Sequence, residues 1–303
     1  MMPGSSDRKP LSIIVTTTLP WPGSKACLDR LCPQIRVLGA ELILADSSGS
    51  GLLDPVPDSY ADVQWLNAPG VSVFELRARA TASARGDIIA WTEDHCLPAI
   101  DWCKRIVAAH AEQANASAIG GAVINGSAKC LIDWANFLVT FGPFVPPVET
   151  RKIRRAPPAA NVSFKRRAIP EGILESGWVE LVLGPRLFAD RMVAIDSRIQ
   201  VEHVQSHGLV GTFLTHFHNG RSTTGLISPG MRVAGRLARV LLYFGMPAVV
   251  LHASFTPLWR KRDFRGRLFA SLPFMALLAC CHSAGSLLGL LLNGPGRSPE
   301  RLR

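Results

Sequence analysis

The sequence lacks several features that would place it in a simple class. Its seven cysteines are odd in number and include no Cys-x-x-Cys pair, so we expect no disulfide framework and a reducing compartment. We also expect no secretory signal, because the apolar stretch Leu11–Val15 is too short for one. Only 18% of the 303 residues are charged and 48% are hydrophobic, which excludes a disordered chain and allows one large or two small domains.

The excess positive charge lies almost entirely in the last quarter of the chain. Lys and Arg exceed Asp and Glu by ten overall, yet residues 231–303 hold eleven basic and only two acidic side chains. The same quarter contains the longest apolar runs. Basic charge interleaved with apolar runs favours membrane lipids as a partner, and the absence of a recognisable binding motif argues against nucleic acid.

Short apolar strands alternate with helical segments over most of the chain. Leu11–Thr17 is a continuous β-branched run, which is typical of a strand buried in a parallel sheet. We expect further strands at 41–45, 63–66, 87–92, 118–123 and 159–164, and helices at 27–38, 73–84, 101–114 and 177–188. This alternation predicts an α/β domain with a mainly parallel sheet, in which ligands collect at the carboxyl ends of the strands.

The chain is expected to divide into a domain of residues 1–230 and a basic, hydrophobic helical region of residues 231–303. Val240–Phe255 is an interrupted run of 16 residues, whereas Leu268–Leu292 has 25 residues without a formal charge, enough to span a bilayer. If both spanned, the basic segment 260–267 would face away from a cytoplasmic domain, against the positive-inside rule. We therefore expect an interfacial first helix and a second that spans or re-enters the membrane; two core helices of a soluble fold are the alternative.

Six segments follow one another in an order that points to a known family. They are LSIIVTT, ELILADSSGSG, RARATASARGDIIAWTEDHC, Gly120-Gly121, AANVSFKRRAI and GWVELVLGPRL. Together they resemble a family 2 glycosyltransferase, an inverting enzyme with a GT-A (Rossmann-like) fold, over about residues 10–225. The resemblance implies a hexosyltransferase that takes its sugar from a nucleoside-diphosphate donor with the help of a divalent metal, Mn²⁺ or Mg²⁺.

The segment Glu93-Asp94-His95 follows a buried strand and carries the expected metal site. Paired carboxylates at a strand end are costly unless a cation neutralises them, and a sugar-diphosphate leaving group needs such a cation. The family's usual triplet is Asp-x-Asp, so the resemblance implies that Glu93, Asp94 and His95 hold the metal, with Asp94 also facing the donor. A neutral imidazole at His95 suits Mn²⁺. The alternative is an acidic cap before a helix.

The resemblance also implies donor contacts by Asp46, Arg77 and Arg221. The Asp46 carboxylate would accept hydrogen bonds from the base or ribose, unless it only forms an Asx turn or caps a helix. Arg77 would hold the phosphates, although Ala78 stands where the family usually has Asn; the alternative is a solvated helix-face arginine. Arg221, in the segment FHNGRS, would contact the diphosphate from a closing loop.

Glu180 matches the position of the family's catalytic base, with Val179 in place of the preceding acid. An inverting transfer needs one carboxylate to deprotonate the acceptor hydroxyl, and apolar neighbours would raise the pKa of Glu180 toward that task. An ordinary exposed glutamate at this position, with Glu175 as the base, is the alternative.

Small residues of the family line the acceptor site, which implies acceptor contacts by Asn161 and Gly121. The adjacent Lys165, Arg166 and Arg167 would suit a phosphate-linked lipid acceptor, or form a solvated charge cluster.

The leading interpretation is a glycosyltransferase of cell-envelope biogenesis that faces the cytoplasm at the membrane and acts on a lipid-linked or glycan acceptor. A non-catalytic relative that binds nucleotide-sugar as a membrane-bound scaffold or partner subunit is the first alternative. A basic membrane-surface protein that merely resembles the family is the second.

Overall fold

The computed structural model describes residues 8–50, 56–148, 156–170, 192–205 and 207–292, with six further residues between 171 and 191. The chain forms two compact units. The first comprises Met1–Ile124 and Pro146–Val204, and the second comprises Asn125–Val145 and Gln205–Arg303. The second unit thus combines the C-terminal region with an excursion from the middle of the chain. The predicted division at residue 230, which rests on charge and apolar length, stays a prediction.

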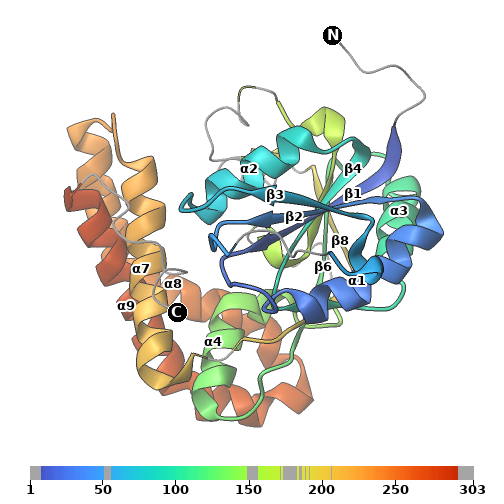
Figure 1. Cartoon of the computed structure of the whole chain (residues 1–303). Helices are drawn as coiled ribbons and strands as arrows, with labels where there is room; N and C mark the ends of the chain where they lie inside the picture. The colour runs from blue at the N-terminus through green and yellow to red at the C-terminus, as the bar shows by residue number, and fades with distance from the viewer. Residues whose placement is uncertain are drawn as a thin grey trace. The chain divides into compact units, whose positions relative to one another are not determined.

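The first unit is built on one eight-stranded sheet in the order β3-β2-β1-β4-β7-β6-β8-β5 (Figure 1). The strands are β1 (Lys9–Thr17), β2 (Glu41–Asp46), β3 (Val63–Asn67), β4 (Gly86–Glu93), β5 (Cys96–Pro98), β6 (Ala118–Asn125), β7 (Val162–Lys165) and β8 (Val193–His203). β1 is buried from Leu11 to Thr17, as its unbroken apolar pattern predicts for a central strand.

The sheet is mixed, which corrects the prediction of a mainly parallel one. β3, β2, β1 and β4 are parallel, as expected, but β7 runs antiparallel to both β4 and β6, and β5 runs antiparallel to β8. The predicted strand at 159–164 begins with a 3₁₀ turn at Ala159–Asn161 and becomes β7 only at Val162. β5 and β8 were not expected from the sequence. Of the predicted helix at 177–188, only Leu183, Arg186 and Leu187 are among the described residues, and these three are helical.

Three helices cover the sheet close to their predicted positions. They are α1 (Lys25–Leu38), α2 (Val73–Ser83) and α3 (Trp102–Glu112). α2 begins where the Ser72 side chain accepts a hydrogen bond from the Glu75 backbone N–H at 3.2 Å, and α1 ends at Gly39, whose φ of 65° favours glycine. α2 packs over β1 and β2, and its Leu76 and Ala80 join a core that includes Ile14, Ile43 and Trp91.

The second unit is helical and consists mainly of α4 (Leu131–Phe141), α7 (Gly208–Ile227), α8 (Val233–Trp259) and α9 (Arg265–Leu292). α7 and α9 pack backbone against backbone. A Cβ atom added to Gly285 of α9 would lie 1.8 Å from the Phe217 carbonyl oxygen, and one added to Gly220 of α7 would lie 2.0 Å from that of His282. Gly285 and Gly289 are spaced by four, a spacing that brings helices together in membranes.

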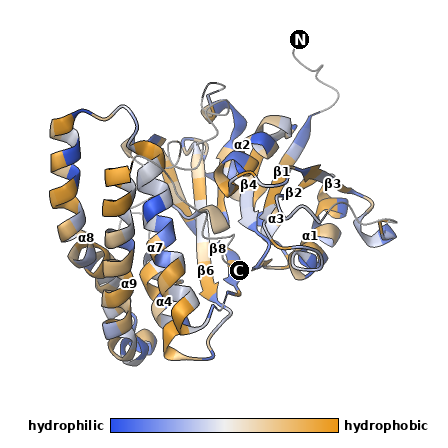
Figure 2. Cartoon of the chain, turned by 60° about the vertical axis from the view of Figure 1, so that its left-hand side comes forward, coloured by the Kyte–Doolittle hydropathy of each residue, from blue (hydrophilic) through white to orange (hydrophobic). Residues whose placement is uncertain are grey.

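Two stretches, Val233–Trp259 and Arg262–Leu292, are long and apolar enough to cross a membrane. The mean hydropathy of an 18-residue window is 1.4 in the first and 1.8 in the second. The first helix is longer than its sequence predicted, because it continues through Pro247 and extends the apolar run at both ends. Figure 2 shows apolar colour over most of α8 and α9. Core helices of soluble proteins reach the same length and hydropathy, and they differ from membrane spans in which side chains face outward.

Candidate functional site

Three strands of the first unit end at the same edge of the sheet with polar side chains. In the parallel register, Thr17 of β1 lies beside Asp46 of β2, and Thr16 lies beside Glu93 of β4. The backbone N–H of Asp94 donates to the Thr16 carbonyl at 3.2 Å, which continues the ladder past the end of β4. The predicted gathering of Asp46, Glu93 and Asp94 at this edge is therefore what the topology produces.

Glu93, His95 and His203 form a compact group of metal-ligand atoms at this edge. His95 Nε2 lies 3.0 Å from His203 Nε2 and 3.3 Å from Glu93 Oε2, and His203 Nε2 lies 3.9 Å from the same carboxylate oxygen. The two imidazole rings are 4.5 Å apart and nearly perpendicular. Two histidines and one carboxylate that converge in this way resemble a three-sided metal site with open positions.

The separations fit one bound cation. Bonds of about 2.1 Å to one ion place two donor atoms about 3.0 Å apart at a right angle and about 3.4 Å apart at a tetrahedral angle. Two of the three separations fall in that interval, and the third needs only a wider angle. Cys96 offers a fourth atom, since the four potential ligand atoms lie within 4.8 Å of one another. Burial and the nearby Glu93 charge raise the pKa of the Cys96 thiol well above its usual value, so a thiolate is disfavoured there.

Asp94 points away from this group and holds His95 instead. Its Oδ1 lies 2.6 Å from His95 Nδ1, and its Oδ2 lies 2.8 Å from the Thr17 hydroxyl oxygen. A carboxylate on Nδ1 leaves Nε2 facing the other potential ligands, which is the usual outer partner of a metal-binding histidine. The geometry thus gives Asp94 a positioning role, and its predicted direct contacts with metal and donor stay predictions.

Arg77 supports the same group from the interior. Its side chain is 1% exposed, which excludes the solvated helix-face alternative. One guanidinium nitrogen lies 3.1 Å from Thr16 Oγ1 and 3.4 Å from Glu93 Oε1, and the guanidinium lies 5.6 Å from the centre of the Trp91 ring. These contacts hold the Glu93 carboxylate, and the predicted phosphate contact by Arg77 stays a prediction.

Opposite charges set the protonation of the group. Burial alone would raise the pKa of Glu93, but the hydrogen bond with His95 and the nearby positive charges outweigh it, and this pKa is held well below its usual range. Burial would lower the pKa of His95, yet the hydrogen bonds with Asp94 and Glu93 raise it to about 9. Without a metal, the His95 imidazolium therefore supplies the positive charge that the paired acids need.

Asp46 lies at the neighbouring strand end and is 6% exposed. Its Oδ1 accepts a hydrogen bond from the Ser48 backbone N–H at 2.6 Å. This bond forms the Asx turn that was the alternative interpretation of Asp46. This bond fixes the start of the Ser/Gly turn after β2. The other carboxylate oxygen is not engaged by that bond, so the turn and the predicted contact with a nucleoside are compatible.

Gly121 and Asn161 are buried in the middle of the sheet. The Asn161 side-chain oxygen accepts from Trp102 Nε1 at 3.0 Å, and its Nδ2 donates to the carbonyl oxygens of Ala122 and Ile199. Asn161 therefore ties β6, β8 and α3 together. The contacts give both residues a structural role, and the predicted acceptor contact stays a prediction.

Replacing Gly121 by Ala tests this structural role. A Cβ atom at Gly121 would lie 2.1 Å from Asn161 Nδ2 and 2.3 Å from the Ile199 carbonyl oxygen, so the substitution is expected to destabilise the first unit by about 1–3 kcal/mol. The measurement is the thermal midpoint of the full chain. Gly266→Ala is the control, because its Cβ meets nothing within 4 Å, and it should leave the midpoint unchanged or higher. Equal midpoints for the two variants would contradict the assigned packing.

Two predicted residues fall elsewhere. Glu180, together with its alternative Glu175, lies outside the described residues. Arg221 belongs to α7 in the second unit, where its backbone carbonyl packs against Gly289 of α9. The predicted base and diphosphate contacts of these residues stay predictions.

The sequence pattern did not identify His203 as a potential metal ligand. It is the last residue of β8 and pairs with Cys96 in the antiparallel β5–β8 ladder, which brings it beside His95. The sequence feature that points to it is its place at the end of the segment AIDSRIQVEH, in which polar and apolar residues alternate as in a strand.

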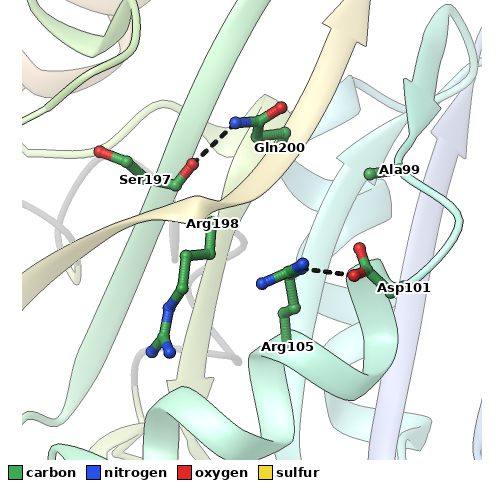
Figure 3. Close-up of a pocket in the computed structure, with 6 residues that line it drawn as sticks. All are labelled: Ala99, Asp101, Arg105, Ser197, Arg198 and Gln200. Atoms are coloured by element: carbon green, nitrogen blue, oxygen red, sulfur yellow. Dashed lines mark hydrogen bonds and ion pairs between the residues drawn. The ribbon is translucent and has the colours of Figure 1, made fainter.

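A separate pocket of about 310 Å³ lies beside β5 and β8 (Figure 3). Its two arginines are already paired: Arg105 Nε lies 2.6 Å from Asp101, and an Arg198 guanidinium nitrogen lies 2.6 Å from Asp196. Because carboxylates already compensate these two charges, the pocket is a weak candidate for binding an anion. The metal-ligand group at the strand edge is the stronger candidate site.

No protein-family model matches the sequence, and no curated protein matches it. Among solved structures, the chain is similar to the mannosyltransferase PcManGT from Pyrobaculum calidifontis in complex with GDP-mannose and Mn²⁺. The TM-score is 0.54 and the identity 14%, over 93% of this chain and 88% of that one. Two further structures are more distant. Residues 1–349 of S. aureus TarS have a TM-score of 0.45 and 8% identity, over 92% of this chain and 90% of that one. A mycobacterial protein has a TM-score of 0.43 and 15% identity, over 65% of this chain and 68% of that one. The likeness to the mannosyltransferase shows a glycosyltransferase-like fold.

Proposed function

We propose that this chain is a metal-dependent glycosyltransferase of the family 2 type that transfers a hexose from a nucleoside-diphosphate sugar to a lipid-linked or glycan acceptor of the cell envelope. The observation that carries the proposal is the group of Glu93, His95 and His203 at the carboxyl edge of the sheet. Ligands of open α/β sheets bind at this edge. The fold that carries this group resembles that of a mannosyltransferase solved with GDP-mannose and Mn²⁺.

Each residue of the site has a task in this proposal. Glu93, His95 and His203 would hold the cation, which when bound would neutralise the developing charge of the diphosphate leaving group. Asp94 and Arg77 keep His95 and Glu93 in the ligand geometry, and Asp46 would bind the nucleoside. Two imidazoles and one carboxylate favour Mn²⁺ over Mg²⁺, because Mg²⁺ prefers an all-oxygen shell.

A panel of nucleoside diphosphates with and without Mn²⁺ tests the proposal. We expect one base to raise the thermal midpoint of the full chain only when Mn²⁺ is present, and the matching nucleoside-diphosphate sugar to be consumed when an acceptor is added. A midpoint that no nucleoside diphosphate shifts in Mn²⁺ would contradict the proposal.

A non-catalytic relative is the second candidate, and one observation favours it. Val179 stands where the family has the first acid of its Glu-Asp pair, so the chemical step has lost one carboxylate. Such a protein would bind nucleoside diphosphate with Mn²⁺ but neither transfer nor hydrolyse the sugar. Both functions predict the same affinity for the donor, and only the glycosyltransferase predicts turnover of the donor sugar.

Glu180→Gln tests the proposed base. If Glu180 deprotonates the acceptor hydroxyl, the variant is expected to lose at least about 10²-fold in kcat while its donor affinity stays unchanged. The same kinetics on Glu175→Gln is the matched control. Loss in the Glu175 variant alone would move the base to that residue, and an equal loss of donor affinity and kcat would give Glu180 a binding role.

We also propose that the second unit attaches the protein to the cytoplasmic face of the membrane. On α8, the apolar side chains point outward: Leu237, Leu241 and Phe244 are 63%, 75% and 72% exposed. The arginines of the same turns point inward, where Arg236 donates to the Leu290 carbonyl at 2.8 Å and Arg239 lies 3.3 Å from the Tyr243 hydroxyl. A helix in water shows the opposite arrangement, and this orientation suits hydrocarbon.

Basic and aromatic side chains at the end of α8 suit the headgroup region. Arg260, Lys261, Arg262, Arg265 and Arg267 follow Trp259, and the Arg265 guanidinium lies 4.7 Å from the centre of the Trp259 ring. Tryptophan gathers at membrane interfaces, and each basic residue near anionic lipid contributes about 1 kcal/mol of attraction. An anchored enzyme of this kind reaches lipid-linked acceptors without releasing them into water.

A further inference from the structure

A basic pocket of about 640 Å³ lies at the opposite edge of the sheet from the metal-ligand group. Its walls come from the start of β1 and β4, the end of α3 and the end of β7, and they include Arg8, Asp87, His110, Lys165, Arg166 and Arg167. β4 runs from Gly86 at this edge to Glu93 at the other, a length of about 20 Å. The pocket is therefore separate from the proposed donor site, and Lys165, Arg166 and Arg167 all line it.

The pocket has an excess of positive charge. Four cationic side chains line it with one carboxylate, Asp87, which lies 3.4 Å from Arg8. The other three cations contact neutral carbonyl oxygens or none: Arg166 Nε donates to Gly86 at 2.7 Å and its Nη2 to Ala84, while Lys165 Nζ donates to Ala114. Carbonyl oxygens accept hydrogen bonds without cancelling the charge, so donors and charge remain for a ligand.

Arg167 is the most available of these cations. Its side chain is exposed, and it makes no hydrogen bond or ion pair within the described part of the chain. Its charge acts on its neighbour: burial, followed by the Arg167 charge, lowers the pKa of Lys165, and burial is the main cause that lowers the pKa of Arg166. A bound anion would relieve this mutual repulsion.

His110 places an unpartnered hydrogen-bond acceptor at the pocket wall. Its ring is 5% exposed, and its Nε2 lies 2.9 Å from the Ser163 hydroxyl, which itself donates to the Ile119 carbonyl. The hydroxyl proton is thus engaged, and Nε2 must carry the hydrogen of the His110–Ser163 bond. Nδ1 is then a buried acceptor that has no partner among the described residues. Buried polar atoms are nearly always satisfied, so a hydrogen-bond donor, such as the hydroxyl group of a ligand, belongs beside it.

We propose that this pocket binds a phosphate-bearing ligand. Phosphate oxygens match the planar fork of a guanidinium and the point charge of an ammonium. Two arginines and a lysine line this pocket, and none of the three forms an ion pair with a carboxylate among the described residues. A pocket of this volume takes one small ligand or one lipid headgroup. Membrane phospholipid and soluble phosphate esters present the same chemistry, and the experiment distinguishes them.

The test compares two double variants of the full chain in detergent. Lys165→Gln/Arg167→Gln removes two pocket charges, and Arg30→Gln/Lys104→Gln removes two exposed charges of the same unit outside it. Binding of pyrophosphate is measured by calorimetry with EDTA present, so that no metal-dependent site takes part. Binding of phosphatidylglycerol in mixed micelles is measured beside it, with phosphatidylcholine as the neutral lipid. We expect the pocket variant to bind at least one anionic probe about tenfold more weakly, and the control variant to bind as the parent does.

The outcomes separate the sources of the phosphate. Loss of pyrophosphate binding assigns the pocket to a soluble phosphate ester, and loss confined to phosphatidylglycerol assigns it to a lipid headgroup. If neither probe distinguishes the pocket variant from the control, the proposal is wrong. Arg167→Glu serves as a second variant if the double variant fails to fold, because this side chain is exposed and makes no hydrogen bond with another described residue. Donor binding in Mn²⁺ should survive all these changes, which keeps the pocket distinct from the proposed function.

Discussion

Replacing His95 and His203 together by Ala is expected to weaken Mn²⁺ binding by more than about 10³-fold and to abolish Mn²⁺-dependent donor binding. The two Nε2 atoms lie 3.0 Å apart, and their removal leaves Glu93 as the last member of the three-sided group. Loss of an outer partner alone costs about 10–100-fold in affinity, so the loss of two direct ligands must exceed that. Calorimetric titration of the full chain with Mn²⁺, followed by nucleoside diphosphate, gives both values.

The histidines are better probes than Glu93. The Glu93 carboxylate also contacts the buried Arg77, so its removal would leave a buried charge with less compensation and destabilise the fold. His252→Ala is the control, because this histidine lies exposed on α8 in the other unit. Unchanged Mn²⁺ binding in the double histidine variant would place the metal elsewhere and contradict the assignment.

Asp94→Asn separates a positioning role from a direct one. An amide oxygen still accepts a hydrogen bond from His95 Nδ1 but lacks the charge that fixes the imidazole, so a positioning Asp94 predicts a loss of only about 10–100-fold. A loss as large as that of the double histidine variant would restore Asp94 as a direct ligand. The same titration therefore tests which of the two arrangements is correct.

The first half of the sheet was predictable because its strands are parallel and because β1, β2 and β4 are largely buried on both faces. Such strands consist of continuous apolar runs, and Leu11–Thr17 and Glu41–Ala45 ended within a residue of their predicted positions. The strand edge that carries Asp46 and Glu93 followed from the same rule. These elements are specified by local sequence, which explains why the pattern located them.

The remaining parts of the site depend on contacts that local patterns do not encode. His203 joins the group through the antiparallel pairing of β8 with the three-residue β5, over a hundred residues from His95 in the sequence. Asp94 and His95 are neighbours, yet only the direction of each side chain separates the positioning acid from the metal-ligand imidazole. Asn161 matched a family segment, but three hydrogen bonds in the interior give it a structural role.

The last prediction concerns the outer face of α8, defined by Leu237, Leu241 and Phe244. If this face contacts hydrocarbon, a cysteine placed at Leu241 should react with a charged, membrane-impermeant maleimide at least about 100-fold more slowly than one placed at Val37 of α1. Both side chains are largely exposed on the protein, 75% and 91%, so the protein itself would permit similar rates. A surrounding apolar medium would exclude the thiolate and the charged reagent from one of them. The measurement uses full-length protein reconstituted into vesicles, with Cys130, Cys280 and Cys281 replaced by Ser to remove the background. Equal rates would place α8 in water and contradict membrane attachment through this face, whereas a slow rate that rises when the protein is diluted with lipid would show that a second copy covers it.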